Sequence, residues 1–264
     1  MDLVLRDVTD GVCVLTLNRP DRMNAWTHEM EARYFDLLAE ADGDPETRVI
    51  VVTGAGRGFC PGFDMEALSA MSSGEGGGNG DAAAAAAERQ PQTFPLTIRK
   101  PIVAAINGAC AGIGLVQALM TDIRIAAAGA KFTTAFARRG LVAEHGSSWI
   151  LPRLIGPARA LDLLLSGRVF LAEEAERLGV VNRVVAKEDV LDETLAYARD
   201  LAANCSPASM AAMKAQVYGD LERGLTESVD DANRLMLESF ARPDFAEGVQ
   251  SFVERRPPDF PPLG

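Results

Sequence analysis

Two glycine-rich segments constrain the fold of this chain most, because each directly follows a short apolar run. Residues 49–53 (VIVVT) and 101–106 (PIVAAI) have the composition of strands that are buried on both faces. The segments behind them, 53–64 (TGAGRGFCPGFD) and 107–114 (NGACAGIG), are rich in glycine. Glycine lets backbone N–H groups approach a ligand closely, so each segment is a candidate oxyanion-binding turn at the end of a strand.

The sequence around these turns alternates between strand and helix signals. Residues 12–17 (VCVLTL) predict a strand, and Thr27 can cap a helix that runs to about Ala41 with one apolar face. A further strand is predicted at 122–126. Strands that alternate with helices are typical of an α/β fold.

Behind Pro157 the chain becomes mostly helical. The apolar periodicity predicts helices at residues 158–165, 172–178, 190–203, 207–218, 224–240 and 245–253. One predicted strand, at 180–185, interrupts them. We therefore expect an α/β core over residues 1–200 and a helical region over residues 201–264, with no linker between them.

The composition excludes several classes of partner. With 26 Lys and Arg against 37 Asp and Glu, the 264-residue chain has a net charge of −11, and we expect no nucleic-acid partner. No apolar run is long enough for a membrane span and no basic leader precedes the first strand signal, so we expect a soluble, cytoplasmic protein without a membrane partner. Two histidines and four scattered cysteines predict neither a metal site nor a disulfide framework.

Residues 71–92 differ from the rest of the chain. A tract rich in glycine and serine is followed by alanines at 82–87, which predicts a mobile surface loop that leads into a helix. Its position directly behind the first glycine-rich turn would suit a lid over a binding site. An uninvolved surface insertion is the alternative.

Glycine-rich turns also occur in nucleotide-binding proteins, but the other parts of those signatures are missing. The segment 54–58 (GAGRG) comes nearest to a dinucleotide loop, yet no acidic ribose partner follows it on a second strand. Neither turn ends in the Gly-Lys-Ser/Thr of a phosphate loop.

Three ordered segments carry a more specific signal than either turn alone. They are 17–25 (LNRPDRMNA), 52–65 (VTGAGRGFCPGFDM) and 105–114 (AINGACAGIG), the last followed by Asp-Ile-Arg at 122–124. In this order and spacing they resemble the signature segments of the crotonase, or enoyl-CoA hydratase/isomerase, superfamily. The resemblance extends over essentially the whole chain.

This resemblance implies a spiral of strand-strand-helix repeats, with a C-terminal helical region that assembles a homotrimer, commonly paired as a dimer of trimers. It implies an acyl-CoA substrate, no separate cofactor, and a thioester oxygen held by the backbone N–H groups of Phe63 and Ile113. The residues that it assigns to binding of coenzyme A and substrate are Arg22, Met23, Ala25, Gly58, Phe59, Gly62, Asp64, Met65, Gly112, Phe252 and Arg255. Asp64 is also predicted to cap the helix behind the first turn.

The acid and base residues separate this chain from the hydratases that it resembles. Hydratases of the superfamily use two glutamates, and the matching positions here are Val116 and Phe136, which cannot move a proton. The segment 140–149 (GLVAEHGSSW) resembles the one in which 3-enoyl-CoA to 2-enoyl-CoA isomerases carry their single acid, and Glu144 falls on that position. His145 beside it is either structural or able to tune that carboxyl group.

One carboxylate suffices for double-bond migration, since it can take a proton from C2 and return it to C4 while the oxyanion hole holds the dienolate. We therefore expect an enoyl-CoA isomerase with Glu144 as the acid and base. The alternatives are a 2-enoyl-CoA hydratase of fatty acid β-oxidation, another reaction that uses the same oxyanion hole, and a non-catalytic acyl-CoA-binding protein.

Overall fold

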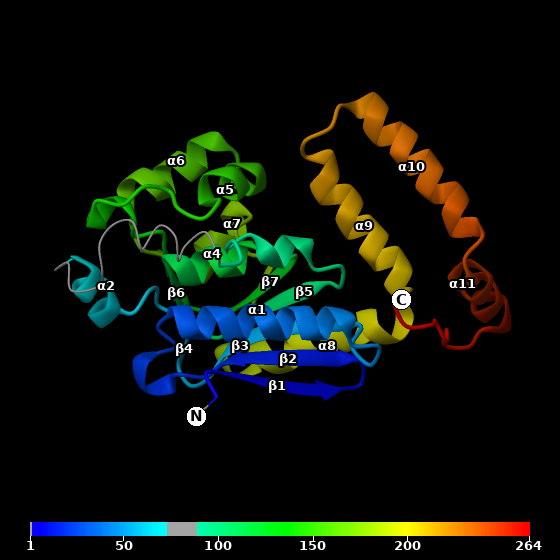
Figure 1. The fold of residues 1–264 in the computed structure, drawn as a ribbon, viewed down its shortest axis with the longest axis horizontal. Helices are drawn as coiled ribbons and strands as arrows, with labels where there is room; N and C mark the ends of the chain where they lie inside the picture. The colour runs from blue at the N-terminus through cyan, green and yellow to red at the C-terminus, as the bar shows by residue number, and fades with distance from the viewer. Residues whose placement is uncertain (1, 73–88) are drawn as a thin grey trace.

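The apolar runs pair into a six-stranded sheet in the order β1-β2-β3-β5-β7-β10, of which Figure 1 labels the first five strands. The structure is a computed structural model that describes residues 2–72 and 89–264, so the predicted lid or insertion lies largely outside the described residues. The strands of this sheet are β1 (Val4–Thr9), β2 (Val12–Leu17), β3 (Val49–Gly54), β5 (Ile102–Ile106), β7 (Ile123–Ala127) and β10 (Arg183–Val185). Only the β1–β2 pair is antiparallel; the other neighbours run parallel.

A second, four-stranded sheet was not predicted. Its strands are β4 (Gly58–Cys60), β6 (Ala109–Ala111), β8 (Lys131–Thr133) and β9 (Phe170–Leu171), in that order. Two of them lie inside the glycine-rich segments, which were expected to be turns throughout. Strands of three residues are too short to show an alternating pattern in sequence, and neighbouring strands rather than local propensity hold them.

The two sheets are linked by a repeated unit. β3, β5 and β7 lie in the large sheet, and each is followed by a short strand, β4, β6 or β8, in the small sheet. Helices α2 (Met65–Ser72) and α4 (Ile113–Leu119) follow the first two of these strand pairs. The expected α/β fold with strand-strand-helix repeats is therefore confirmed.

Helices cover the large sheet from different sides. Helix α1 (His28–Gly43) packs against β1 and β2, while α8 (Val190–Asn204) packs against β2, β3, β5 and β7. The predicted cap of α1 is confirmed, because the Thr27 side chain accepts a hydrogen bond of 3.2 Å from the Met30 N–H.

The remaining short elements connect these layers. They are the helices α5 (Ser147–Ile155), α6 (Pro157–Ser166) and α7 (Ala172–Leu178), and the 3₁₀ turns η1 (Pro20–Arg22), η2 (Phe94–Thr97), η3 (Ala137–Arg139) and η4 (Lys187–Asp189). The strand predicted at 180–185 is half as long as expected, because α7 ends at Gly179 in a left-handed turn and only residues 183–185 reach β7. In the described residues no helix combines the length and the apolar character that crossing a bilayer requires.

Helices α9 (Pro207–Asp220), α10 (Leu225–Phe240) and α11 (Pro243–Glu254) form an arm that projects from the core on the side away from α2 (Figure 1). The tail behind α11 returns to the core, where Arg48 Nη2 donates a 2.7 Å hydrogen bond to the Phe260 carbonyl. The expected boundary between an α/β core (1–200) and a helical region (201–264) stays a prediction. Helix α8 extends to Asn204 and so crosses that boundary.

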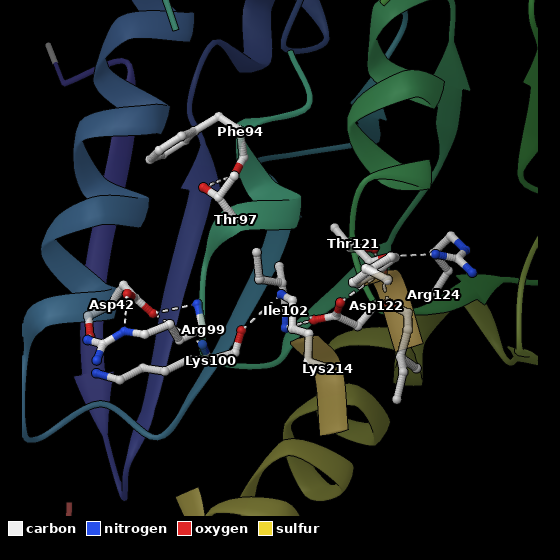
Figure 2. Close-up of polar contacts among 12 residues, drawn as sticks. Asp42, Phe94, Thr97, Arg99, Lys100, Ile102, Thr121, Asp122, Arg124 and Lys214 are labelled. Atoms are coloured by element: carbon white, nitrogen blue, oxygen red, sulfur yellow. Dashed lines mark hydrogen bonds and ion pairs between the residues drawn. The ribbon is translucent and has the colours of Figure 1, made fainter. Parts of the chain in front are cut away.

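A buried ion pair anchors the arm to the sheet. Lys214 Nζ on α9 lies 2.8 Å from Asp122 Oδ2 at the start of β7, and that oxygen also accepts the Ile102 N–H at 2.7 Å (Figure 2). Tyr218 OH donates to the other carboxylate oxygen at 3.0 Å. Burial lowers the pKa of Lys214 and Asp122 opposes that shift, so the pair depends on both partners being present.

Candidate active site

The two expected oxyanion donors lie on adjacent turns. Strands β4 and β6 pair in parallel, so the residues behind them emerge at the same edge of the small sheet. Gly62 and Gly112 occupy these turns with φ angles of +118° and +50°, which side chains other than glycine rarely adopt. A Cβ atom on Gly112 would lie 3.8 Å from Gly62 Cα, so the two turns are in contact.

The N–H groups behind these glycines are available to a ligand. A β-bridge pairs Trp26 with Phe63 through hydrogen bonds of Gly62 and Asp64, which turns the Phe63 N–H away from Trp26. Ile113 is the first residue of α4, where an N–H has no partner within the helix. Among residues 2–72 and 89–264 neither N–H has a recorded hydrogen-bond partner, so both can donate to one oxyanion.

A cavity of about 540 Å³ opens at these turns. Most of the predicted site residues line it: Arg22, Met23, Ala25, Gly62, Phe63, Asp64, Met65, Gly112, Ile113 and Glu144. Segments that are far apart in the sequence therefore meet at one site.

Four predicted binding residues do not border this cavity. Gly58 and Phe59 are buried in β4. Phe252 lines a separate depression on the arm, and Arg255 ends α11 nearby. The role of Phe252 and Arg255 in covering coenzyme A stays a prediction, and within one chain they lie away from the site.

Several lining residues were not predicted from the sequence. They are His28, Pro61, Glu66, Thr134, Ala135, Arg139 and Leu141. Thr134 and Ala135 directly follow β8, which pairs in parallel with β6 and so ends beside the second donor turn. A sequence-based prediction of β8 as a strand would have placed Thr134 and Ala135 beside the second donor turn.

Glu144 lies in the loop before α5, with its side chain 33% exposed. Its backbone carbonyl accepts the Ser147 N–H, and its carboxylate lies 3.7 Å from the imidazole of His145. His145 has a φ of +56°, an uncommon value for a side-chain-bearing residue, so this loop holds a strained conformation at the cavity wall. Phe136 also lines the cavity, whereas Val116 is buried within α4.

The other two carboxylates of the cavity wall are engaged with arginines. Asp64 Oδ2 lies 2.9 Å from Arg19 Nη2, and Asp64 Oδ1 accepts the Glu66 N–H, which confirms the predicted helix cap. The Arg19 hydrogen bond, the N–H groups of α2 and the Arg19 charge hold the pKa of Asp64 below its usual value, although burial acts in the opposite direction. Glu66 Oε1 lies 2.8 Å from Arg22 Nη1 at the rim.

The cysteines beside the turns are unsuited to act as nucleophiles. Burial raises the pKa of Cys60 to about 12 and also raises the pKa of Cys110, so both remain thiols. Among the described residues no group of three or more His, Cys, Asp or Glu side chains is placed to hold a metal ion.

Comparison with known proteins adds the family context. The model of the family described as enoyl-CoA hydratase/isomerase matches residues 7–262. The chain is 36% identical to the 1,2-epoxyphenylacetyl-CoA isomerase of Escherichia coli K12, with 98% of both chains covered. It is 38% identical to a "Probable enoyl-CoA hydratase" of Rhodobacter capsulatus, with 96% of both covered.

Solved structures of proteins named as enoyl-CoA hydratases or isomerases are also similar to this chain. A probable enoyl-CoA hydratase/isomerase from Mycobacterium abscessus superposes with a TM-score of 0.89 at 32% identity, covering 98% of this chain and 99% of that one. The enoyl-CoA hydratase EchA12_1 from Mycobacterium marinum is 51% identical, with a TM-score of 0.71 over 84% of this chain and all of that one. The similarity therefore includes both the sequence and the fold.

Proposed function

Because the chain belongs to the enoyl-CoA hydratase/isomerase family, we propose that it moves the double bond of a 3-enoyl-CoA to the 2-position, with Glu144 as the acid and base. One observation carries this choice. Of the three carboxylates that line the cavity in the described structure, Asp64 and Glu66 pair with arginines, while only Glu144 has no arginine partner. Glu144 is therefore the carboxylate best suited to exchange protons with a substrate.

The proposed reaction uses few groups of the chain. The N–H groups of Phe63 and Ile113 hold the thioester oxygen, which gains negative charge when the Glu144 carboxylate removes a proton from C2. The dienolate then takes the same proton back at C4, which leaves the double bond between C2 and C3. Each oxyanion donor is expected to lower the barrier by about 2.7 to 4 kcal/mol.

Hydration of a 2-enoyl-CoA is the second candidate, since several relatives bear the name probable enoyl-CoA hydratase. That reaction needs water activated at one point and a proton delivered at another. The positions that carry glutamates in the hydratases it resembles hold Val116 and Phe136, which favours isomerisation. The E. coli relative is named as an isomerase, although of a different acyl-CoA.

The test measures both activities on the purified protein: migration of the double bond in a 3-enoyl-CoA and hydration of a 2-enoyl-CoA. Glu144→Ala and the isosteric Glu144→Gln should each reduce isomerisation by at least about 100-fold, the contribution typical of a general acid or base. The matched control is Glu188→Gln, an exposed carboxylate in η4. Robust hydration that survives Glu144→Ala contradicts this mechanism, and tight acyl-CoA binding without turnover indicates a binding protein.

Family membership also supports assembly as a homotrimer or a dimer of trimers, a cytoplasmic location and an acyl-CoA substrate without a further cofactor. Large apolar side chains on α10 and α11 are exposed in the single chain, among them Leu225, Leu237, Phe252 and Val253. Apolar surface of this extent on one arm supports burial in an interface between copies. Fatty acid metabolism is the expected setting.

A further inference from the structure

A second cavity, of about 380 Å³, adjoins the candidate active site. The two cavities share His28, Phe63, Ile113 and His145 as wall residues. The remaining wall of the second cavity is contributed by Trp26, Glu31, Arg89, Gln90, Pro91 and Gln92. A molecule that binds at the two N–H donors can therefore extend into a space with many polar side chains.

Glu31 on α1 is the buried charge of this wall, with its side chain only 6% exposed. Trp26 Nε1 donates to its Oε2 at 3.1 Å, and Gln92 Nε2 donates to the same oxygen at 2.5 Å. No hydrogen bond to Oε1 is recorded within the described part of the chain. That leaves Oε1 as the acceptor for a group inside the cavity.

The orientation of Glu31 is held by two linked amides, the half-buried Gln92 and the buried Gln117. Gln117 Nε2 on α4 donates to Gln92 Oε1 at 2.6 Å, which fixes the Gln92 amide with its nitrogen toward Glu31. A buried carboxylate is costly unless its oxygens find donors, and among residues 2–72 and 89–264 only Oε2 of Glu31 accepts a hydrogen bond. The arrangement is that of an acceptor kept ready for a donor that the described chain does not supply.

We propose that this second cavity binds the acyl part of the substrate and that Glu31 selects acyl groups that carry an uncharged O–H or N–H donor, such as a hydroxyl. This inference rests on the proposed acyl-CoA function. Once the thioester oxygen is held by Phe63 and Ile113, the sulfur and C2 leave the carbonyl in different directions. The coenzyme A part then lies in the first cavity, against Arg22, Met23 and Met65. The acyl end lies in the adjoining second cavity.

The experiment compares three kinds of saturated thioester, which cannot undergo double-bond migration: hexanoyl-CoA, a series of its hydroxy derivatives and a series of its methoxy derivatives. Within each series the substituent moves along the chain one carbon at a time. Calorimetry on the full-length protein gives their dissociation constants. At one position the hydroxy compound should bind about tenfold or more tightly than hexanoyl-CoA, as expected for a hydrogen bond to a charged acceptor. The methoxy compound, which only accepts, should gain nothing.

Glu31→Gln tests the assigned group directly. The new amide oxygen can keep the bonds from Trp26 and Gln92, which places its NH₂ toward the cavity and turns the acceptor into a donor. The hydroxy preference should then disappear and the methoxy compound should bind more tightly than it does to the unaltered protein. Glu29→Gln, at an exposed carboxylate two residues earlier on α1, should leave the affinities for all three kinds of thioester unchanged.

The possible results separate this inference from the proposed function. If no hydroxyl position improves binding to the unaltered protein, Glu31 is only a structural tie between α1 and residues 89–92, and the inference is wrong even if isomerisation is observed. If the hydroxy preference depends on Glu31 but no isomerisation occurs, the acyl subsite stands and the reaction is wrong. If Glu31→Gln fails to fold, the comparison of hydroxy and methoxy compounds on the unaltered protein still shows whether the acyl site prefers a hydrogen-bond donor. Equal affinity for the two compounds at every position would contradict the inference.

Discussion

At the scale of single residues, Gly114 determines how closely the two donor turns approach. A Cβ atom at this position would lie 2.3 Å from the Cys60 carbonyl oxygen and 2.7 Å from Cys60 Cβ, both of which belong to the buried strand β4. Gly114→Ala should therefore push α4 from β4 and lower the free energy of unfolding by about 1 to 3 kcal/mol or more. Urea denaturation measures this loss.

The matched control for that substitution is Gly43→Ala at the end of α1, where a new Cβ meets nothing within 4 Å. Its effect should stay within about 0.5 kcal/mol. Because Ile113 precedes Gly114, the first variant should also lose isomerase activity. An unchanged unfolding midpoint for Gly114→Ala would show that the two turns can separate without cost.

The lowered pKa of Asp64 predicts that the free energy of unfolding depends on pH. Its folded-state pKa lies below the usual value of about 3.9, so its carboxylate stabilises the fold above that pH and the contribution is lost as the pH falls through the folded-state pKa. Asp64→Asn should lower the free energy of unfolding at neutral pH, and the difference from the unaltered protein should shrink in acid. Urea unfolding at several pH values between about 3 and 7 tests this.

Asp21→Asn in η1, an exposed residue, is the control and should give a curve parallel to that of the unaltered protein. A difference between Asp64→Asn and the unaltered protein that stays constant from neutral to acid pH would mean that the Arg19 ion pair adds no stability. The variant would then report only the exchange of one capping side chain for another.

Residue-scale sequence patterns predicted the donor turns but not Glu31. The turns are recognisable because a glycine-rich segment directly follows each of two buried strands, and the family resemblance then assigned the donors within them and Glu144. Glu31 stands on an amphipathic helix, where a single glutamate is indistinguishable from the many that face water. Its hydrogen bond from Gln92, whose own amide is held by Gln117, comes from residues far along the chain, so no local pattern predicts it.

At the scale of elements, the ion pair between Lys214 and Asp122 is the most consequential contact of α9. The Lys214 side chain is 7% exposed, and its removal leaves the Asp122 carboxylate with only the Ile102 N–H and the Tyr218 hydroxyl among the described residues. Lys214→Met should lower the free energy of unfolding by about 3 kcal/mol, the cost typical of removing one partner of a buried pair. Amide hydrogen exchange should show the loss concentrated in α9.

Lys187→Met, an exposed lysine in η4, is the control for this effect and should leave both measurements unchanged. If Lys214→Met is as stable as the unaltered protein, packing of α9 on the core holds the arm without the ion pair. Faster exchange across the whole chain, rather than in α9, would indicate that arm and core unfold as one unit.

Long elements of the fold were predictable from the sequence, whereas the short strands were not. Long helices such as α1 and α10, and buried strands such as β3, carry enough periodic or apolar residues to be predicted close to their observed bounds. The short strands β4, β6 and β8 do not, since each is defined by its neighbours in the small sheet. That sheet positions both oxyanion donors, so the geometry of the site was the part least visible in sequence.

At the scale of the whole molecule, the arm carries many of the large apolar side chains that are exposed among the described residues. Large apolar side chains of α10 and α11 are exposed, while the chain as a whole carries a net charge of −11. A single copy leaves this surface uncovered, and the arm projects away from its own core (Figure 1). Contact with further copies would bury it and would also explain why Phe252 lies away from the cavity of its own chain.

Charge placed on this face should separate the copies without unfolding them. Leu237→Glu combined with Val253→Glu, at side chains that are 64% and 73% exposed, should convert the expected trimer to a monomer in analytical ultracentrifugation. Circular dichroism should stay unchanged, because both positions lie outside the core.

Leu5→Glu on the edge strand β1 is the control and should preserve the assembly. A monomeric unaltered protein, or a trimer that tolerates both glutamates, would mean that the arm has another role, and the apolar face would then call for a different partner.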